Sequence, residues 1–357
     1  MKRRNFLKSA VGGTAAMGIA APAIAQTSKV VWDMPTSWPS GLMLQDSATF
    51  FAERVADLTD GQFEIRVRQA GEIVPALEVF NAVQAGTVQC GHSWSGYLSG
   101  LNPALMIEAG IPFGLTAEQH ATWLREAGGA EMMDEVFARF NVKSFLVGDL
   151  GGQFMGWLNK EVNSLEDMRG LRFRIAGLGG KIFEEIGVSV QLISMGEVLP
   201  GLERGVIDGA GGGTPTDNVR VGLHRVARYG YYPGWNAQSS ALSAYVNRDA
   251  WDGLPEEFQK AMSTAAVAAH AEHVTHCQNL DRITIAELQS GDEDVEFRAL
   301  PDEILNALKA AAEKHLKIFS DESEDFARIY ENYNKFSSEI RALQNMTVYP
   351  LERQRNT

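Results

Sequence analysis

The chain has 357 residues, of which 45% are hydrophobic and 22% are charged, and its formal net charge is −13 at pH 7. This length is too great for one compact core and predicts two lobes. An acidic chain without a basic cluster is a poor partner for nucleic acids or anionic membranes, and we expect neither. Its two cysteines, Cys90 and Cys277, exclude a disulfide scaffold. Whether they pair or remain buried thiols is left open.

The amino-terminal segment has the composition of an export signal. Lys2, Arg3, Arg4 and Lys8 precede a weakly apolar run rich in glycine and alanine, and Ala25 ends a stretch of small residues suited to cleavage. Paired arginines followed by Phe-Leu-Lys fit the twin-arginine type of signal. We therefore expect residues 1–25 to be a signal peptide and the periplasm to be the destination. Removing these four basic residues would take the net charge from −13 to −17.

The apolar pattern along the chain predicts alternating strands and helices. Strands are expected at 29–34, 63–68, 88–92, 142–148, 171–175, 189–192 and 206–208, and helices at 42–58, 75–85, 180–186 and 197–204. Such alternation with short connections is typical of βαβ units. The predicted fold class is therefore α/β with a mostly parallel sheet.

Two long helical stretches follow. Residues 255–290 keep a helical period without glycine or a second proline, so one helix of ~36 residues is expected to reach across both lobes. His270, His273 and His276 fan over about 120° on this helix and do not converge on a metal. We expect them to form a solvated polar face. Residues 301–344 are also helical in character, with aromatic residues that would cap one side of the protein.

The segment 168–176 carries a candidate anion receptor. Side chains alternate along a strand, so Leu171, Phe173 and Ile175 would pack inward while Arg172 and Arg174 face the other way. A guanidinium presents a planar fork of donors that fits both oxygens of a carboxylate. Taken alone, such an arginine is more often a surface salt-bridge partner. The following glycine loop lacks the residues of a P-loop or a dinucleotide fingerprint, and no catalytic triad or zinc motif is present.

Three loops with aromatic and small polar residues follow predicted strands. They contain Trp38, then Trp94 and Tyr97, and then Trp235 and Asn236. Open α/β sheets bind their ligands beyond the carboxyl ends of strands, so we expect these loops to form walls of one cleft together with Gln153 and Arg174.

The chain resembles the solute-binding proteins of TRAP (tripartite ATP-independent periplasmic) transporters over nearly its whole length after the leader. The most specific segments are Met168-Arg-Gly-Leu-Arg-Phe-Arg-Ile-Ala-Gly and Leu192-Ile-Ser-Met-Gly-Glu-Val-Leu-Pro-Gly-Leu-Glu-Arg-Gly-Val-Ile-Asp-Gly. Ala70-Gly-Glu-Ile-Val-Pro-Ala and Tyr231-Tyr-Pro-Gly-Trp are similar to the branch that binds α-keto acids and related small monocarboxylates. The resemblance implies a two-lobed periplasmic binding protein fold (type II-like) whose interwoven lobes close around an organic acid.

The resemblance also implies roles for particular residues. Arg174 aligns with the arginine that grips the carboxylate, and Gln153 with a glutamine that contacts the ligand or a metal. Where that branch has two glutamates and a tryptophan that hold a cation and fill the site, this chain has Gly211, Gly212 and Ala237. Hard cations need several oxygen ligands, so we expect no bound metal and no cofactor. The glycines predict a roomier pocket and a ligand with a bulky or aromatic side group.

The sequence therefore predicts the residues of the site, the extent of each lobe and the function of the protein. The substrate-binding residues are expected to be Arg174, Gln153, Trp38, Trp94, Tyr97, Gly212, Trp235 and Asn236. Lobe I would comprise 27–150 and 240–281, lobe II 151–239 and 282–320, and a helical tail 321–357. We expect no enzyme, but a protein that captures a 2-keto or 2-hydroxy acid and delivers it to membrane permease subunits. Two alternative functions are left open, a ligand-presenting partner of a sensor kinase and a periplasmic oxidoreductase. Whether the protein forms a homodimer is also left open.

Overall fold

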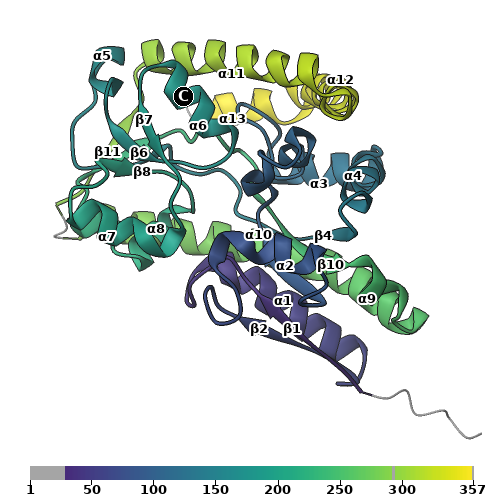
Figure 1. Ribbon diagram of the computed structural model, residues 1–357. Helices are drawn as coiled ribbons and strands as arrows, with labels where there is room; N and C mark the ends of the chain where they lie inside the picture. The colour runs from purple at the N-terminus through teal and green to yellow at the C-terminus, as the bar shows by residue number, and fades with distance from the viewer. Residues whose placement is uncertain (1–28, 292–293, 356–357) are drawn as a thin grey trace, which may run out of the picture.

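The computed structural model describes residues 29–291 and 294–355 (Figure 1). The predicted signal peptide therefore lies outside the described residues. The strands are β1 (Val30–Pro35), β2 (Phe63–Arg68), β3 (Cys90–Ser93), β4 (Val142–Asp149), β5 (Gly156–Leu158), β6 (Arg172–Arg174), β7 (Ser189–Gln191), β8 (Gly209–Ala210), β9 (Tyr229–Tyr232), β10 (Ala241–Asn247) and β11 (Glu296–Ala299). The helices are α1 (Met43–Leu58), α2 (Val79–Gln84), α3 (Ala117–Glu126), α4 (Gly129–Ala138), α5 (Leu165–Met168), α6 (Leu178–Glu185), α7 (Val198–Glu203), α8 (Pro215–Arg220), α9 (Arg248–Asp252), α10 (Glu256–Ser290), α11 (Asp302–Glu322), α12 (Glu324–Thr347) and α13 (Tyr349–Arg355).

The strands form two separate groups, one in each lobe. In the first, β1 pairs with β2 in parallel, and β10 lies antiparallel between β3 and β4. A bridge between Thr36 and His92 joins the two small sheets. In the second group six strands have the order β11-β9-β5-β8-β6-β7, with β5 antiparallel to both of its neighbours and the other pairs parallel. Because β10 returns to the first group after five strands of the second, the lobes are interwoven. The residue boundaries of the lobes stay a proposal.

The segments that cross between the lobes meet at Asp149, the last residue of β4. Its carboxylate accepts hydrogen bonds from Gly151 N (2.7 Å), Ser240 N (2.9 Å) and the Ser239 hydroxyl (2.5 Å). The outgoing chain after β4 and the returning chain before β10 are thus tied to one side chain. His273 of α10 contacts the backbone of the same residue, with its Nδ1 3.2 Å from Asp149 N. Three crossings therefore meet at this one buried residue, and burial raises the pKa of its carboxyl to about 6.

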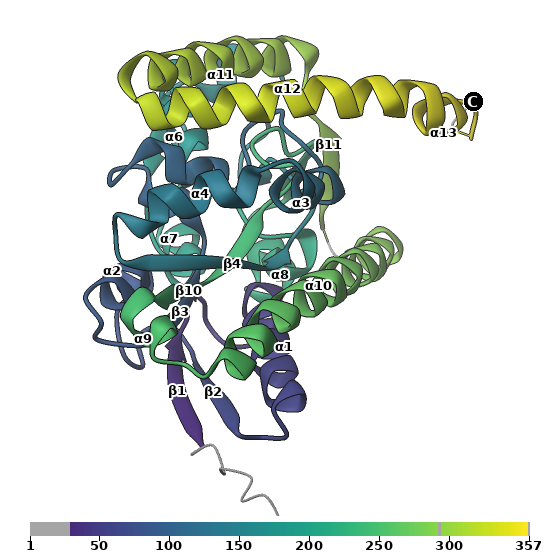
Figure 2. The same cartoon turned by 90° about the vertical axis from the view of Figure 1, so that its right-hand side faces the viewer.

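Helix α10 crosses the molecule as expected, packing on α1 and β4 and reaching α8 (Figures 1 and 2). Its 35 residues would span about 52 Å. The expectation of a solvated histidine face on it was wrong for His270 and His273, which are buried. This face of α10 lies against α1 and β4, so His273 Nε2 instead meets Met43 O at 2.8 Å. Only His276 stays partly exposed, near Asp46.

The predicted helical stretch after residue 301 is two helices. Ser323 ends α11, and its hydroxyl accepts a hydrogen bond from Phe326 N at the start of α12, so a serine cap separates them. Helix α11 packs on α6 of the second lobe, whereas α12 packs on α3 and α4 of the first. Phe326 and Tyr333 are buried there. The end of α12 and α13 then project from the body (Figure 2).

Strand β8 lies later than expected. Residues 206–208 were predicted as a strand, but Gly209 and Ala210 form it, between β5 and β6. Val206 is exposed, and the pairing with β5 and β6 begins only at Gly209.

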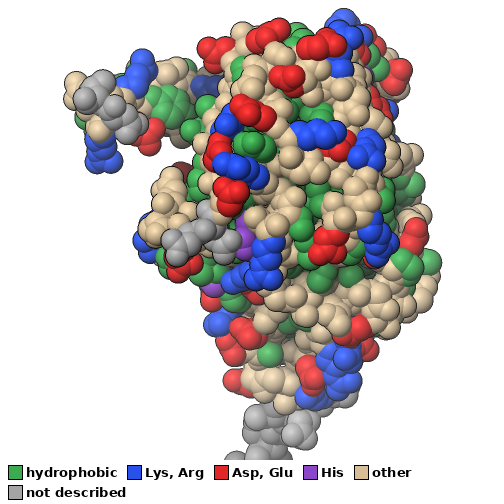
Figure 3. Space-filling model, turned by 90° about the vertical axis from the view of Figure 1, so that its left-hand side faces the viewer, with side chains coloured by type: hydrophobic (Ala, Val, Ile, Leu, Met, Phe, Trp, Pro, Cys, Tyr) green, Lys and Arg blue, Asp and Glu red, His purple; other side chains and the backbone are tan. Residues whose placement is uncertain are grey.

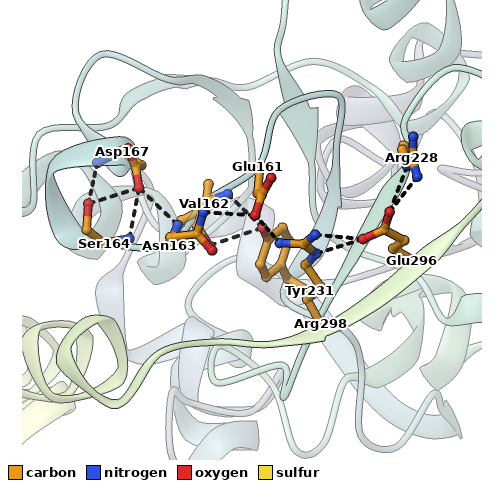
Figure 4. Close-up of polar contacts among 9 residues, drawn as sticks. All are labelled: Glu161, Val162, Asn163, Ser164, Asp167, Arg228, Tyr231, Glu296 and Arg298. Atoms are coloured by element: carbon orange, nitrogen blue, oxygen red, sulfur yellow. Dashed lines mark hydrogen bonds and ion pairs between the residues drawn. The ribbon is translucent and has the colours of Figure 1, made fainter.

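A polar network holds the outer strands of the larger sheet together (Figure 4). Arg298 on β11 binds Glu161 and Glu296, and Glu296 also binds Arg228. The hydroxyl of Tyr231 on β9 accepts a hydrogen bond from Val162 N and donates one to Val162 O. These contacts fix β9, which leads into the turn that reaches the site.

The two cysteines are both buried and unpaired, which settles the alternative that the sequence left open. Burial raises the pKa of each thiol above its ordinary value. In the described ranges, no helix combines the length and the apolar character needed to cross a membrane.

Candidate functional site

A cavity lies where residues of both sheet groups meet. Three wall segments come from the loops after β1, β3 and β9, as the sequence predicts. Of the eight residues expected to bind substrate, the cavity is lined by Trp38, Trp94, Tyr97, Gln153, Arg174, Gly212 and Asn236.

Arg174 is the charged side chain of this cavity. Leu171, Phe173 and Ile175 are all buried in the core, as the alternation predicts. Arg174 itself is only 3% exposed. Its guanidinium donates to Ile193 O (3.0 Å), Gly211 O (2.9 Å) and the Tyr97 hydroxyl (3.4 Å). A guanidinium has five N–H donors, so two remain for a ligand.

Arg172 has a different role from Arg174, although both leave the same strand. It is half exposed and binds Asp208 through two nitrogens, at 2.8 Å and 3.1 Å. This guanidinium holds the pKa of Asp208 well below its usual range. Arg172 is therefore a structural salt-bridge partner, and Arg174 alone of the two lines the cavity.

The aromatic wall is positioned by buried polar contacts behind it. Trp38 Nε1 donates to His92 Nδ1 at 2.9 Å, and His92 Nε2 lies 2.9 Å from the Ser47 hydroxyl. Burial lowers the pKa of His92 to about 3, so the ring is neutral and can accept from Trp38. Tyr97 packs edge-on against Trp94, with ring centroids 5.3 Å apart. The role of His92 could not be predicted from local patterns, because its partners Trp38 and Ser47 come from distant segments.

The turn after β9 brings Asn236 to the cavity next to Gln153. Gly234 N donates to Gln153 O at 2.8 Å, and a Cβ on Gly234 would lie only 2.2 Å from that oxygen. Only glycine permits this approach. Trp235 does not line the cavity, contrary to the expectation for it. Its side chain is 1% exposed and packs between Phe113 and Phe183, because consecutive residues of the turn point to opposite sides.

Several residues that line the cavity were not predicted from the sequence. They are mostly apolar, namely Leu44, Leu150, Ile175, Ala176, Met195, Ser240 and Leu242. Leu150, Ser240 and Leu242 flank the points where the chain crosses between lobes. Crossing segments must pass the cleft, so the predicted lobe boundaries were a signal that could have identified these three residues.

The cavity is small, with a volume of about 50 Å³. This is space for roughly four water molecules. Other side chains lie in the space beside the glycines, and whether the pocket is roomier than in similar proteins stays a prediction. Arg174 Nη1 lies 2.8 Å from where a Cβ of Gly212 would be, and Met195 Cε lies 2.9 Å from that of Gly213.

Comparison with known proteins identifies the family. Residues 34–322 match the sequence profile described as bacterial extracellular solute-binding protein, family 7. The chain belongs to this family. A monocarboxylate 2-oxoacid-binding periplasmic protein from Nostoc sp. is 37% identical over 95% of both chains. As a TRAP solute-binding protein, this chain is periplasmic and works with membrane permease subunits.

Solved structures of TRAP solute-binding proteins confirm the two-lobed fold. One from Bordetella bronchiseptica, with copurified calcium and picolinate, is 34% identical with a TM-score of 0.89, covering 92% of this chain and 97% of that one. One from Pseudoalteromonas atlantica, with sodium and pyruvate, is 30% identical with a TM-score of 0.88, covering 91% and 99%. These comparisons support neither a sensor-kinase partner nor an oxidoreductase.

Proposed function

We propose that this TRAP solute-binding protein captures a small monocarboxylate with a 2-oxo or 2-hydroxy group. The observation that carries the proposal is the buried guanidinium of Arg174. Its partners are two backbone carbonyls and a hydroxyl, and among the described residues no carboxylate lies within ion-pair distance of it. A buried charge without a counter-ion is costly, so a ligand carboxylate at this position is strongly favoured.

The rest of the cavity fits the remainder of such an acid. Trp94 Nε1 and Asn236 Oδ1 are buried atoms that have no hydrogen-bond partner within the part of the chain that the structure describes. An asparagine amide can present either its oxygen or its nitrogen, so these two groups suit a 2-oxo or 2-hydroxy oxygen. Leu44, Met195 and Leu242 would contact a short carbon chain. The cavity's small volume favours an acid the size of pyruvate over one with an aromatic group.

The similar proteins agree with this ligand class. The Nostoc relative is described as binding monocarboxylate 2-oxoacids, and the Pseudoalteromonas structure contains pyruvate. We propose that the ligand is held by lobe closure alone and that the protein catalyses no reaction. Capture then requires only that the lobes close around the acid and exclude water.

The cavity does not fit the cations found in those structures. Sodium and calcium take several oxygen ligands, mostly carboxylates and carbonyls. Here no aspartate or glutamate of the described residues lines the cavity, and the Gly211 carbonyl already accepts a hydrogen bond from Arg174. No group of three or more acidic, histidine or cysteine side chains in the described residues is placed to hold a metal. A cation beside Arg174 would add to an uncompensated positive charge. We therefore propose that the acid binds without a metal.

A thermal-shift panel tests both proposals on the purified protein. Pyruvate, 2-oxobutanoate and lactate should raise Tm by several degrees, whereas phenylpyruvate and 2-oxoglutarate should not, since one is too large and the other has a second, unpaired carboxylate. Chelation with EDTA or added calcium should change the pyruvate Kd by less than twofold. Absence of any shift with the three small acids would refute the ligand class. Loss of binding in EDTA that calcium restores would refute metal-free binding.

A homodimer stays a proposal for the assembly of this protein. The end of α12 and α13 project from the body (Figures 2 and 3) and carry apolar side chains that are half or more exposed, at Leu343, Met346 and Leu351. A cluster of exposed apolar residues on a projecting helix is typical of a protein contact. The Bordetella structure is described as a dimer.

A further inference from the structure

Helix α1 of the first lobe begins without a capping side chain of its own. Leu42 occupies the N-cap position and provides no hydrogen bond to the first turn. Instead, Asp217 of α8, from the second lobe, places Oδ1 2.6 Å from Met43 N. Asp217 is 174 residues further along the chain. A carboxylate at a helix N-terminus satisfies a free N–H and interacts favourably with the helix dipole.

This hydrogen bond joins the two walls of the cavity. On one side, Leu44 lines the cavity directly after Met43. On the other, Gly213 lines it, and a Cβ on Gly213 would lie 3.2 Å from the Asp217 Cβ. Asp217 is held in place by its own helix, because its backbone N–H donates to the Thr214 hydroxyl. The walls cannot separate without breaking the bond between Asp217 and Met43.

The contact of Asp217 with Met43 lies in the interior of the protein. The side chain is fully buried, and among the described residues its Oδ2 has no hydrogen-bond partner. Burial raises the pKa of this carboxyl to about 7, with Asp46 of α1 and Asp281 of α10 adding to the rise and Arg220 opposing it. Burying an acid in this way is unfavourable, so the contact alone does not close the lobes.

A second contact crosses at the same place. Arg220, also on α8, donates to Gly41 O at 3.1 Å and lies 3.7 Å from the carboxylate of Asp46. Both partners belong to the segment around the start of α1. Arg220 is partly exposed, so its ion pair contributes little. The buried bond of Asp217 is therefore the stronger of the two cross-lobe contacts.

We propose that Asp217 is a closing latch, a positioning residue that holds the lobes together around the bound acid by capping helix α1 from the opposite lobe. The proposal rests on the proposed function only in that binding of the acid drives closure. The latch then slows release of the ligand and does not touch the ligand itself. Its effect should appear mainly in the dissociation rate, because the bond between Asp217 and Met43 must break before the walls of the cavity can separate.

The test compares Asp217→Ala and Asp217→Asn with the wild-type protein, using pyruvate as the probe. Asp217→Ala removes the cap and should weaken pyruvate binding at least tenfold, mostly through faster dissociation in stopped-flow measurements. Asp217→Asn keeps an oxygen that accepts from Met43 N and should recover most of the affinity. If Asp217→Ala does not fold, Met43→Pro provides the same test. It removes the N–H donor at a helix position that tolerates proline, and it should also weaken pyruvate binding at least tenfold.

Thr116→Ala is the matched control, since it removes the side-chain cap of α3, which hydrogen-bonds Gln119 N away from the cavity. It should lower thermal stability without changing pyruvate affinity. Unchanged pyruvate dissociation in Asp217→Ala would overturn the latch. If pyruvate does not bind the wild type, the proposed ligand is wrong, and hydrogen exchange of residues 42–46 in the ligand-free protein decides about the latch. Faster exchange there in Asp217→Ala supports it, and equal exchange overturns it.

Discussion

Replacement of Arg174 by alanine is expected to abolish the thermal stabilisation that pyruvate gives this protein. The guanidinium is 3% exposed and is the charged group that lines the cavity. Removing one partner of a buried charge pair typically costs 2–5 kcal/mol, or about 30-fold to several thousand-fold in Kd. Micromolar binding needs about 8 kcal/mol, so the remaining contacts would leave at best weak binding.

Arg174→Lys should recover little of this affinity. A lysine ammonium has no planar fork, so it cannot keep the contacts to Ile193 O and Gly211 O while also meeting both carboxylate oxygens. Arg172→Ala is the matched control, because Arg172 leaves the same strand but binds Asp208 outside the cavity. It should retain the pyruvate-dependent shift in Tm. A full shift in Arg174→Ala, or its loss in Arg172→Ala alone, would contradict the assignment of the carboxylate site.

Trp235→Ala should lower the free energy of unfolding by about 3–5 kcal/mol, the usual cost of emptying a buried tryptophan site. The ring centroid lies 5.2 Å from that of Phe183 and 6.1 Å from that of Phe113, so the substitution opens a hole in the core. The large effect on stability follows from this packing, whereas a residue at the cavity wall would chiefly affect binding. Urea unfolding of the ligand-free protein measures the change.

Trp235→Phe is the informative companion variant. It keeps most of the ring contacts and removes an indole N–H that is buried without a hydrogen-bond partner among the described residues. Losing an unsatisfied donor is nearly neutral, so this variant should be destabilised by much less than the alanine variant. Equal stability of Trp235→Ala and the wild type would mean that Trp235 is not part of the core.

Local sequence patterns predicted the elements whose stability is local. The helix expected at 255–290 is found at Glu256–Ser290, because a long run without glycine or proline has few alternatives. The burial of His270 and His273 on it could not be predicted, since α3 lies beside His270 and α1 and β4 pack against His273, all from far along the chain. The position of strand β8 was predicted wrongly for a similar reason. Gly209 and Ala210 form a strand only because they pair with β5 and β6.

In the candidate site, too, local patterns identified some residues, whereas residues that depend on distant contacts were missed. Arg174 was identified from alternation along one short strand, although Ile175, predicted to point inward, also lines the cavity. Leu44 and Met195 were missed, because an apolar pattern predicts burial but does not distinguish a core from a cavity wall. The space beside Gly212 and Gly213 could not be judged from the sequence, because Arg174 and Met195 reach it from distant segments. Asp217 was not recognised because its partner lies 174 residues away.

The junction at Ser323 adds a second attachment between the lobes, since α11 packs on the second lobe and α12 on the first. The first attachment is the carboxylate of Asp149, where the other crossings meet. A body fixed at one point can turn in any direction, but a body fixed at two points turns about the line that joins them. We therefore expect the two lobes to rotate relative to each other as rigid bodies, about a hinge axis that passes through Asp149 and Ser323. A ligand-free crystal structure whose rotation axis passes far from either residue would exclude this motion.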